Sequence, residues 1–251
     1  MSSLNDKIKD YWEGEADAYD REVEGNLECS RTAEGWISLV LENAPAKKRL
    51  EILDVGTGPG FFPIVLGRRG HHVTGIDLTE NMIGLAKKNI EAAGVDADLH
   101  VMDSHALGFP DNTFDMVISR NVTWTLDDPE QVYREWKRVL APGGTMLVFD
   151  ACWYLWRYDK ELEVLYLENE KRIRAKYGRD IHAHTDPEKG AALSRQLFLS
   201  DKVRPKWDIE YLLQLGFTRV FAQPDITDLV WDDFQRELNW VTPQFIVGAV
   251  K

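Results

Sequence analysis

Cysteine is scarce in this chain of 251 residues, which contains only Cys29 and Cys152. Two cysteines are too few for a disulfide framework, so the composition indicates a protein of the reducing cytosol. Long apolar runs are missing too. Stretches such as residues 61–66 are far too short to span a bilayer, and residues 1–10 are polar and charged, unlike a secretion signal. We therefore expect a cytoplasmic protein that does not cross a membrane.

Positive charge is also in deficit, with 30 lysines and arginines against 42 aspartates and glutamates and a net charge of −12. The mean field of such a chain repels nucleic acid unless a local basic patch overrides it. Apolar side chains, in contrast, are plentiful: hydrophobic residues make up 44% of the chain, and nine of them are tryptophan. This composition supports a packed core rather than disorder, and the length suits one large α/β domain.

Residues 51–60, Glu-Ile-Leu-Asp-Val-Gly-Thr-Gly-Pro-Gly, form the most informative stretch. They predict a buried strand that runs into a glycine turn. Gly56, Gly58 and Gly60 let the backbone take positive φ and come close to a ligand, and such a turn at a strand's end is a cofactor cradle in doubly wound α/β folds. A tight turn without a ligand is the alternative. Asp54 could accept hydrogen bonds from a ligand or hold the loop's own donors. The G-x-G-x-G spacing differs from the dinucleotide fingerprint.

The next two predicted strands also end in acids. Asp77 closes one, 17 residues after Gly60, and its two oxygens match the vicinal hydroxyls of a ribose. It could instead cap the next helix, but Thr79 can do that, which would leave Asp77 free. Asp103 and Ser104 close the following strand, where they suit an adenine edge, although Asp103 could merely cap a turn. The repetition of the pattern favours ligand contacts.

Strands and helices alternate strictly as far as residue 150, which implies a parallel sheet with right-handed crossovers. The connection between the last two strands is short, so we expect an antiparallel pair there. Cap residues would be Ser30 and Thr79, and Pro59 suits a first helical turn. The expected strands are 51–55, 72–77, 99–102, 114–119, 145–149, 218–223 and 244–250, and the expected helices include 5–20, 30–44, 79–93, 128–140, 159–177, 206–215 and 231–240.

Residues 152–205 interrupt this pattern and are longer than a simple connection. We interpret them as a lid over the carboxyl edge of the sheet. Residues 157–206 contain 12 basic and 9 acidic residues, a local excess of about +3 within a chain of −12. This charge could attract an anionic small substrate, or it could be an ordinary solvated surface. An aromatic cluster opens the insert: Trp153, Tyr154, Trp156 and Tyr158.

Taken together, five motifs resemble those of a class I S-adenosylmethionine-dependent methyltransferase. The resemblance covers about residues 48–150 and the final strand pair. It implies a doubly wound, mostly parallel, Rossmann-like sheet of seven strands whose last strand is antiparallel, with a helical lid insert. The motifs are EILDVGTGPG at 51–60, GID at 75–77, VMDS at 101–104, FDMVISRN at 114–121 and RVLAPGG at 138–144. The single domain would comprise N-terminal helices (1–45), a cofactor-binding core (46–151), the lid (152–205) and the rest of the sheet (206–251).

The resemblance implies S-adenosyl-L-methionine as the cofactor and assigns its contacts by position. The glycine loop would hold the methionine part, acids at the strand ends would hold ribose and adenine, and two N-terminal tyrosines could close the cleft. These residues are Asp54, Gly56, Thr57, Gly58 and Gly60; Asp77, Leu78 and Met82; Asp103 and Ser104; Arg120 and Asn121 at the sulfonium; and Tyr11 and Tyr19.

The methyl acceptor is less well defined. Thr123 and Trp124 stand where an N-P-P-Y-type signature would indicate amino-group methylation of nucleic acid or glutamine. With the acidic charge, this favours a small molecule, with no nucleic acid or membrane partner. An RNA or protein methyltransferase and a non-catalytic cofactor-binding protein remain alternatives, and a nicotinamide dehydrogenase is the weakest one. The oligomeric state is open.

The sequence singles out no catalytic residue. A base is needed only if the acceptor must lose a proton, and the candidates are His182, His184, Tyr154 and Asp150. The two histidines with Cys152 are too few for a metal site, so we expect no metal.

Overall fold

A computed structural model describes residues 3–178 and 187–251 of the chain. Its centre is a seven-stranded sheet in the order β3-β2-β1-β4-β5-β7-β6. Every neighbouring pair is parallel except the two that involve β7, which runs antiparallel to both β5 and β6. The seven strands and the antiparallel last strand are therefore confirmed. The strands are β1 (Glu51–Val55), β2 (His72–Asp77), β3 (Asp98–Val101), β4 (Phe114–Arg120), β5 (Leu140–Asp150), β6 (Arg219–Gln223) and β7 (Phe245–Val250).

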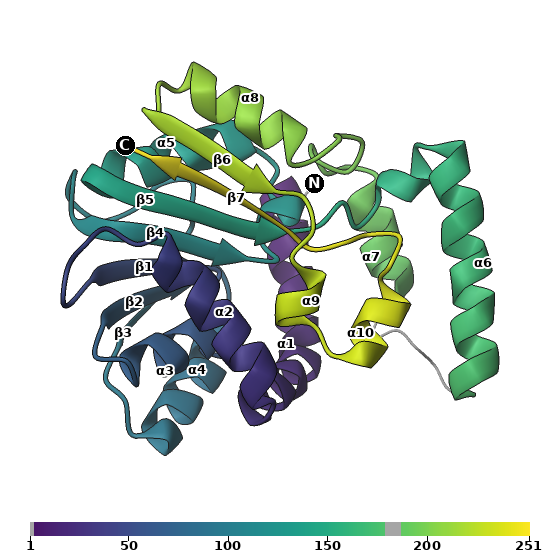
Figure 1. The fold of residues 1–251 in the computed structure, drawn as a ribbon, viewed down its shortest axis with the longest axis horizontal. Coiled ribbons are helices and arrows are strands. Elements are labelled where there is room, and N and C mark those ends of the chain that lie inside the picture. Colours follow the sequence, from purple (N-terminus) through teal and green to yellow (C-terminus); the bar gives the residue numbers. More distant parts are fainter. Residues whose placement is uncertain (1–2, 179–186) are drawn as a thin grey trace.

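Helices cover both faces of this sheet, as a doubly wound fold requires (Figure 1). One face carries α2 (Ser30–Glu42), α3 (Phe61–Gly67) and α4 (Glu80–Ala93). The other carries α5 (Pro129–Val139) and α8 (Lys206–Gln214). The remaining helices are α1 (Leu4–Glu28), α6 (Lys160–Tyr177), α7 (Pro187–Ser194), α9 (Thr227–Val230) and α10 (Asp233–Leu238), with short 3-10 turns at Thr123–Thr125 and Leu155–Arg157.

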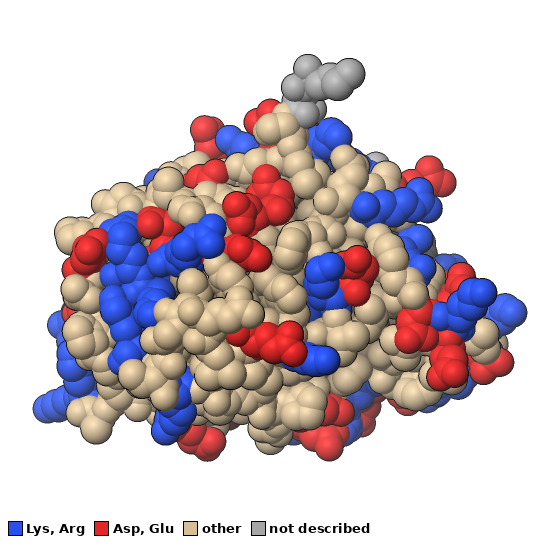
Figure 2. Space-filling view, turned by 90° about the horizontal axis from the view of Figure 1, so that it is seen from above, with Lys and Arg blue, Asp and Glu red and all other residues tan. Residues whose placement is uncertain are grey.

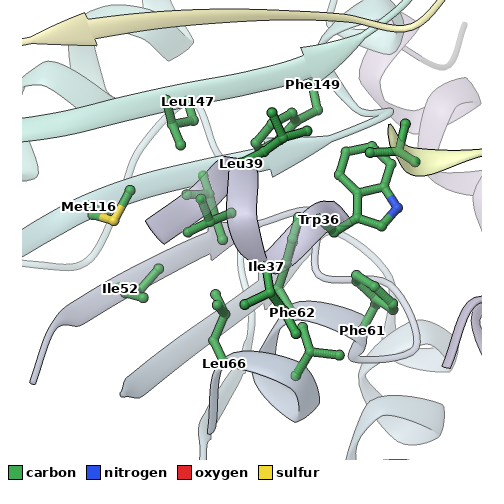
Figure 3. Packing of buried hydrophobic residues seen from close by; sticks show 14 of the residues in the cluster. Trp36, Ile37, Leu39, Ile52, Phe61, Phe62, Leu66, Met116, Leu147 and Phe149 are labelled. Atoms are coloured by element: carbon green, nitrogen blue, oxygen red, sulfur yellow. The ribbon is translucent and has the colours of Figure 1, made fainter. Parts of the chain in front are cut away.

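Alternate side chains of the central strands pack into two separate hydrophobic cores, one on each face of the sheet. In β1, Ile52 packs toward α2 and α3, whereas Leu53 packs toward α5, and both are fully buried. Figure 3 shows Trp36 of α2 meeting Phe62 of α3 and Phe149 of β5. The rings of Trp36 and Phe149 lie edge to face, 5.2 Å between centroids. Each such buried side chain contributes about 1.5–3 kcal/mol to folding, so the strand ends are held on a stiff scaffold.

The helices outside the two layers gather beyond the carboxyl ends of the parallel strands (Figure 1). Helix α1 contacts α2, α4 and α7, and α6 contacts α10. The N-terminal helix and the insert thus lie together at the edge of the sheet where doubly wound folds bind ligands. No helix within the described ranges has both the length and the apolar character needed to cross a bilayer.

Several predicted boundaries were wrong. Helix α1 continues to Glu28 rather than ending near residue 20, and its last turn closes with a bond from the Cys29 amide to the Gly25 carbonyl. Ser30 is the first residue of α2 rather than its cap. Helix α3 starts at Phe61, because Gly60 takes a left-handed φ of 95° at the cap, so Pro59 lies in the preceding turn. The helix expected over 231–240 is the shorter α10 (Asp233–Leu238), and α9 (Thr227–Val230) precedes the expected range.

Candidate active site

The glycine loop has the left-handed backbone that its sequence predicts. Gly56, Gly58 and Gly60 have φ values of 69°, 51° and 95°. A Cβ added at Gly56 would lie 2.2 Å from a methyl carbon of Val122, so only glycine fits there. Gly60 faces α4 instead, with its added Cβ 3.4 Å from Ala86. The first two glycines therefore expose the loop, and the third lets α3 and α4 pack closely.

A cleft of about 730 Å³ opens in front of this loop, at the carboxyl ends of β1, β2, β3 and β4. This is the edge of the sheet at which doubly wound folds bind nucleotide-type ligands, so the cleft suits a nucleoside-based cofactor. Ten of the fourteen predicted site residues line it: Tyr19, Gly56, Gly58, Asp77, Leu78, Met82, Asp103, Ser104, Arg120 and Asn121. The sequence did not point to several others, among them Asn5, His105 and Asp127.

Asp54 and Thr57 lie behind the cleft wall, which they do not line. Asp54 is 2% exposed, and its Oδ2 accepts a hydrogen bond of 2.7 Å from the Thr57 hydroxyl. Burial raises the pKa of Asp54 to about 7. Of the two roles open to Asp54, the structure supports the one in which it fixes the loop, and it does so through the Thr57 hydroxyl.

Asp77 lines the cleft. The expectation that Thr79 leaves Asp77 free is wrong, because Asp77 itself accepts hydrogen bonds from Thr79. Its Oδ2 accepts the Gly58 amide at 3.1 Å, and its Oδ1 accepts the Thr79 amide at 3.0 Å and the Thr79 hydroxyl at 2.9 Å. Thr79 occupies the cap position of α4 without making a side-chain cap bond of its own. A carboxylate has about four acceptor positions, so Asp77 can tie the glycine loop to α4 and still accept from a ligand.

Asp103 caps its turn and also faces the cleft. Its Oδ1 accepts the His105 amide at 2.9 Å and lies 2.6 Å from His105 Nδ1, while its Oδ2 accepts the Asn5 amide group at 2.8 Å. His105 Nε2 lies 2.9 Å from Asp127 Oδ1. The hydrogen bond to Asp103 raises the pKa of His105, and the same bond lowers the pKa of Asp103 to about 2. A histidine ring flanked by two carboxylates therefore closes this end of the cleft.

Arg120 stands at the other end of the cleft and is covered by aromatic rings. Its guanidinium carbon lies 4.3 Å from the ring centroid of Phe61, 5.2 Å from that of Trp36 and 5.7 Å from that of Phe62. Burial lowers the pKa of Arg120, and Glu22 is the foremost of the acids that oppose this. The rings hold the cation in place (about 2 kcal/mol or more for a desolvated cation–π pair).

Asn121 is held in a strained conformation by residues distant in the sequence. Its φ is 58°, which is uncommon for a residue other than glycine. Its amide donates to the Phe149 carbonyl at 2.8 Å, and its side-chain Oδ1 accepts from Gln244 Nε2 at 2.9 Å. Because Asn121 Oδ1 accepts from Gln244, the side-chain nitrogen of Asn121 is the atom that hydrogen-bonds the Tyr19 hydroxyl. Burial raises the pKa of Tyr19 far above its ordinary value, so the phenol stays protonated.

A second, larger cavity of about 1,840 Å³, partly open to solvent, adjoins the first, and the two share Tyr19 and Asn121 in their walls. Its lining comes from α1, the turn after β4, the start of the insert, α6 and the α9–α10 segment. Tyr11, predicted to close the cofactor cleft, lies in this wall instead. We call this cavity the aromatic pocket because eight aromatic residues line it: Tyr11, Tyr19, Trp124, Trp153, Tyr154, Trp156, Tyr166 and Trp231.

A buried ion network holds one wall of the aromatic pocket. Arg204 bridges Asp150 and Asp208, with its Nη1 2.9 Å from Asp150 Oδ2 and its Nη2 2.8 Å from Asp208 Oδ1. All three side chains are at most 1% exposed. Asp150 Oδ2 also accepts the backbone amide of Trp124 at 2.8 Å, and Oδ1 accepts the indole of Trp153 at 2.9 Å. The network therefore fixes two rings of the pocket.

These contacts argue against Asp150 and Tyr154 as general bases. Both oxygens of Asp150 are engaged, and its side chain is inaccessible to an acceptor. Tyr154 lines the aromatic pocket, but burial raises its pKa, so it is protonated at neutral pH. His182 and His184 lie outside the described residues. Within residues 3–178 and 187–251, no three histidine, cysteine, aspartate or glutamate side chains gather into a possible metal site.

Comparison with known proteins shows what this chain resembles. Residues 53–148 match the sequence profile of a family described as "Methyltransferase domain". The chain is 36% identical to demethylmenaquinone methyltransferase from Thermus thermophilus over 116 residues, which are 45% of this chain and 51% of that protein. It is 32% identical to phosphoethanolamine N-methyltransferase 1 from Arabidopsis thaliana over 113 residues, 45% of this chain and 23% of that protein. The chain thus spans about half, or less, of the curated relatives it matches.

Solved structures agree on the fold. A SAM-dependent methyltransferase from Aquifex aeolicus superposes with a TM-score of 0.57 at 20% identity, covering 92% of this chain and 97% of that one. Phosphoethanolamine N-methyltransferase 2 from Haemonchus contortus, solved with S-adenosylhomocysteine, gives a TM-score of 0.66 at 18% identity, covering this whole chain and 60% of that one.

The fold and the cleft resemble those of class I S-adenosylmethionine-dependent methyltransferases. Residues 53–148, from β1 to β5, match the methyltransferase domain. The predicted fold class, the methyltransferase class and S-adenosylmethionine as the cofactor of the class are confirmed.

Proposed function

We propose that this chain transfers the methyl group of S-adenosylmethionine to a small molecule held in the aromatic pocket. The observation that carries the proposal is the shared boundary of the two cavities at Tyr19 and Asn121. A donor in the cleft and an acceptor in the aromatic pocket would meet across these two residues. Methyl transfer from a sulfonium is an in-line displacement, so two binding sites that open onto one junction are what the reaction requires.

The residues present fit the cofactor. Gly56 and Gly58 bring bare backbone to the cleft, where a side chain at Gly56 would clash with Val122. Asp77 would accept the ribose hydroxyls, and Met82 would pack against the adenine. The bound sulfonium supplies an activated methyl group, so the protein's contribution is proximity and alignment, which can be worth about 7–11 kcal/mol.

A small acceptor is also what the curated relatives suggest, since their names refer to a demethylmenaquinone and to phosphoethanolamine. Our expectation of an anionic acceptor now has one concrete candidate contact. Arg157 lines the aromatic pocket, stacked 4.4 Å from the ring centroid of Trp156, and its buried Nε has no hydrogen-bond partner. It could hold an anionic group of an acceptor whose reactive end lies at the junction.

The RNA methyltransferase alternative would need a basic surface near the site. Figure 2 shows lysines and arginines gathered toward the side of the molecule where the C-terminus lies, while acidic and basic side chains alternate over the rest of that face. That side is remote from the strand ends that carry the two cavities. On the face that Figure 2 shows, this distribution favours the small-molecule proposal for the site.

Calorimetry tests the cofactor half of the proposal. We expect the protein to bind S-adenosylmethionine, and Asp77→Ala to weaken binding at least tenfold, because hydrogen bonds to charged groups are worth about 1.5–3 kcal/mol each. The matched control is Asp96→Ala, which removes an exposed carboxylate outside the cleft. Unchanged affinity of the Asp77 variant would refute the assignment.

Labelled cofactor tests the transfer half. The protein is incubated with methyl-labelled S-adenosylmethionine and a metabolite extract of its host, and the labelled product is identified. Label in a small metabolite supports the proposal, and label in RNA or protein supports the alternative. Tight cofactor binding with no label in any fraction would instead indicate a non-catalytic binding protein.

A further inference from the structure

The junction of the two cavities is enclosed by a continuous series of aromatic rings. Trp12 lies 5.2 Å from Tyr19 and 5.9 Å from Trp124, and Trp124 lies 5.3 Å from Tyr154, all measured between ring centroids. Trp124 is fixed against the junction itself, because its indole donates to the Asn121 carbonyl at 3.0 Å. The electron-rich faces of tryptophan and tyrosine attract cations, tryptophan most strongly.

The charged side chains around the junction also favour a cation there. Glu22 of α1 lines the aromatic pocket and acts electrostatically on both Tyr19 and Arg120. In the described part of the chain, the arginine and lysine side chains that line the two cavities are Arg120 and Arg157. Arg120 is covered by three rings, and Arg157 stacks on Trp156, beside Tyr166. Neither is presented as a bare cation beside the reacting atoms.

These features distinguish two kinds of acceptor. An anionic nucleophile, such as a thiolate or a phenolate, would need a positive group or a base at the junction. A neutral nucleophile gains positive charge as the methyl group arrives, and an aromatic enclosure with a nearby carboxylate stabilises that charge. The tyrosines at the junction stay protonated, and Asp150 is sealed in its ion network. The site therefore suits the neutral nucleophile.

We infer that the methyl acceptor is a neutral amine nitrogen and that the product is an ammonium held by the aromatic rings and Glu22. The nitrogen lone pair forms the new N–C bond, and the electron pair of the breaking C–S bond stays on sulfur as a neutral thioether. The positive charge thus passes from sulfur to nitrogen. An aliphatic amine is protonated in neutral solution (pKa about 10), so it gives its proton to water before the transfer. If the acceptor is a primary or secondary amine, the new ammonium afterwards loses a proton to water. The inference rests on the proposed methyl transfer and names its substrate class.

A matched pair of probes tests the inference without knowledge of the natural acceptor. The protein is first saturated with S-adenosylhomocysteine and then titrated with choline or with its neutral isostere, 3,3-dimethyl-1-butanol, by calorimetry. We expect choline to bind roughly tenfold more tightly, as a desolvated cation–π site predicts. Equal binding of the two probes, or no binding of choline, overturns the inference.

Variants locate the site of choline binding. Glu22→Gln and Trp124→Leu should each weaken choline severalfold and leave the neutral probe unchanged. The controls are Glu24→Gln on the same helix and Trp240→Leu, both exposed and outside the aromatic pocket. An equal loss for both probes would indicate a merely structural effect and would overturn the assignment of these residues.

Methylation of a panel of small amines, thiols and phenols gives the second readout. Label on nitrogen supports the inference, and label confined to sulfur or oxygen overturns it while leaving the proposed function intact. Failure to bind S-adenosylhomocysteine in the first step would overturn the proposed function itself, so the two failures are distinguishable.

Discussion

Replacement of Arg204 by methionine should leave two buried carboxylates without the cation they share. The guanidinium donates to Asp150 at 2.9 Å, to Asp208 at 2.9 and 2.8 Å, and to the Thr123 hydroxyl at 2.7 Å. Methionine fills a similar length of space but offers none of these donors. Asp208 would keep its bond from the Tyr133 hydroxyl at 2.6 Å, which cannot neutralise it.

The magnitude follows from the burial of the network. Breaking a buried ion pair by removing one partner costs about 3–5 kcal/mol, because an uncompensated charge remains. In a chain of this size, each kcal/mol lowers the melting temperature by roughly 2–4 °C. We therefore expect Arg204→Met to lower it by roughly 6–20 °C. Arg204→Lys should have a melting temperature between those of the wild type and Arg204→Met, since lysine keeps the charge but not the planar guanidinium.

Urea unfolding followed by tryptophan fluorescence measures the free energy directly. The matched control is Arg195→Met, an exposed arginine in the same insert, which should change the free energy of unfolding by at most about 0.5 kcal/mol. The double variant with Asp208→Asn removes one stranded charge, so it should be more stable than the sum of its single changes predicts. A cost below about 1 kcal/mol for Arg204→Met would refute the view that the network is a tightly coupled buried pair.

Three further variants probe the cleft. Gly56→Ala should reduce cofactor affinity and stability, because of its positive φ and the clash with Val122, whereas Gly84→Ala in open space on α4 should stabilise by about 0.4–1 kcal/mol; equal effects would contradict the close approach. Replacing His105 by glutamine should destabilise the protein most at pH values below the ordinary histidine pKa. The pKa of His105 is raised in the folded state, so this histidine contributes stability at low pH that is lost as the pH rises through the folded-state pKa. Chemical unfolding at several pH values measures this effect, and a destabilisation that grows with pH would contradict it. Gln244→Leu should lower the rate of methyl transfer more than cofactor affinity, because it frees the Asn121 amide to rotate away from the junction; comparing turnover with calorimetry decides this.

The sheet and the cofactor cleft could be predicted because their signals are local. Residues 51–60 contain a strand, a turn and a helix start in one stretch, and the alternation that follows fixes the parallel order. Asp77 and Asp103 each stand at a strand end, so topology alone brings them to one edge. Even the third glycine was placed correctly in the loop, although its role is to pack against α4 rather than to face the cleft.

The details that failed depend on partners far along the chain. Asn5 reaches Asp103 across 98 residues, and nothing in the sequence around either signals the pair. His105 is different. Its place two residues after an aspartate is the spacing of a side-chain-capped turn, and this signal could have drawn attention to it. Sequence patterns therefore identify groups that act on their own neighbours better than groups that act across the fold.

Asp150 shows that a distant partner can also change a residue's predicted function. At the end of a strand beside the predicted lid it had the position of a general base, and its sequence neighbours gave no reason to exclude it. Arg204, 54 residues later, changes its role by enclosing it with Asp208 and turning both oxygens toward the walls of the aromatic pocket. A carboxylate that positions two tryptophans cannot also collect a proton from the acceptor. The acceptor must then react without help from this group, which is the condition that a neutral amine satisfies.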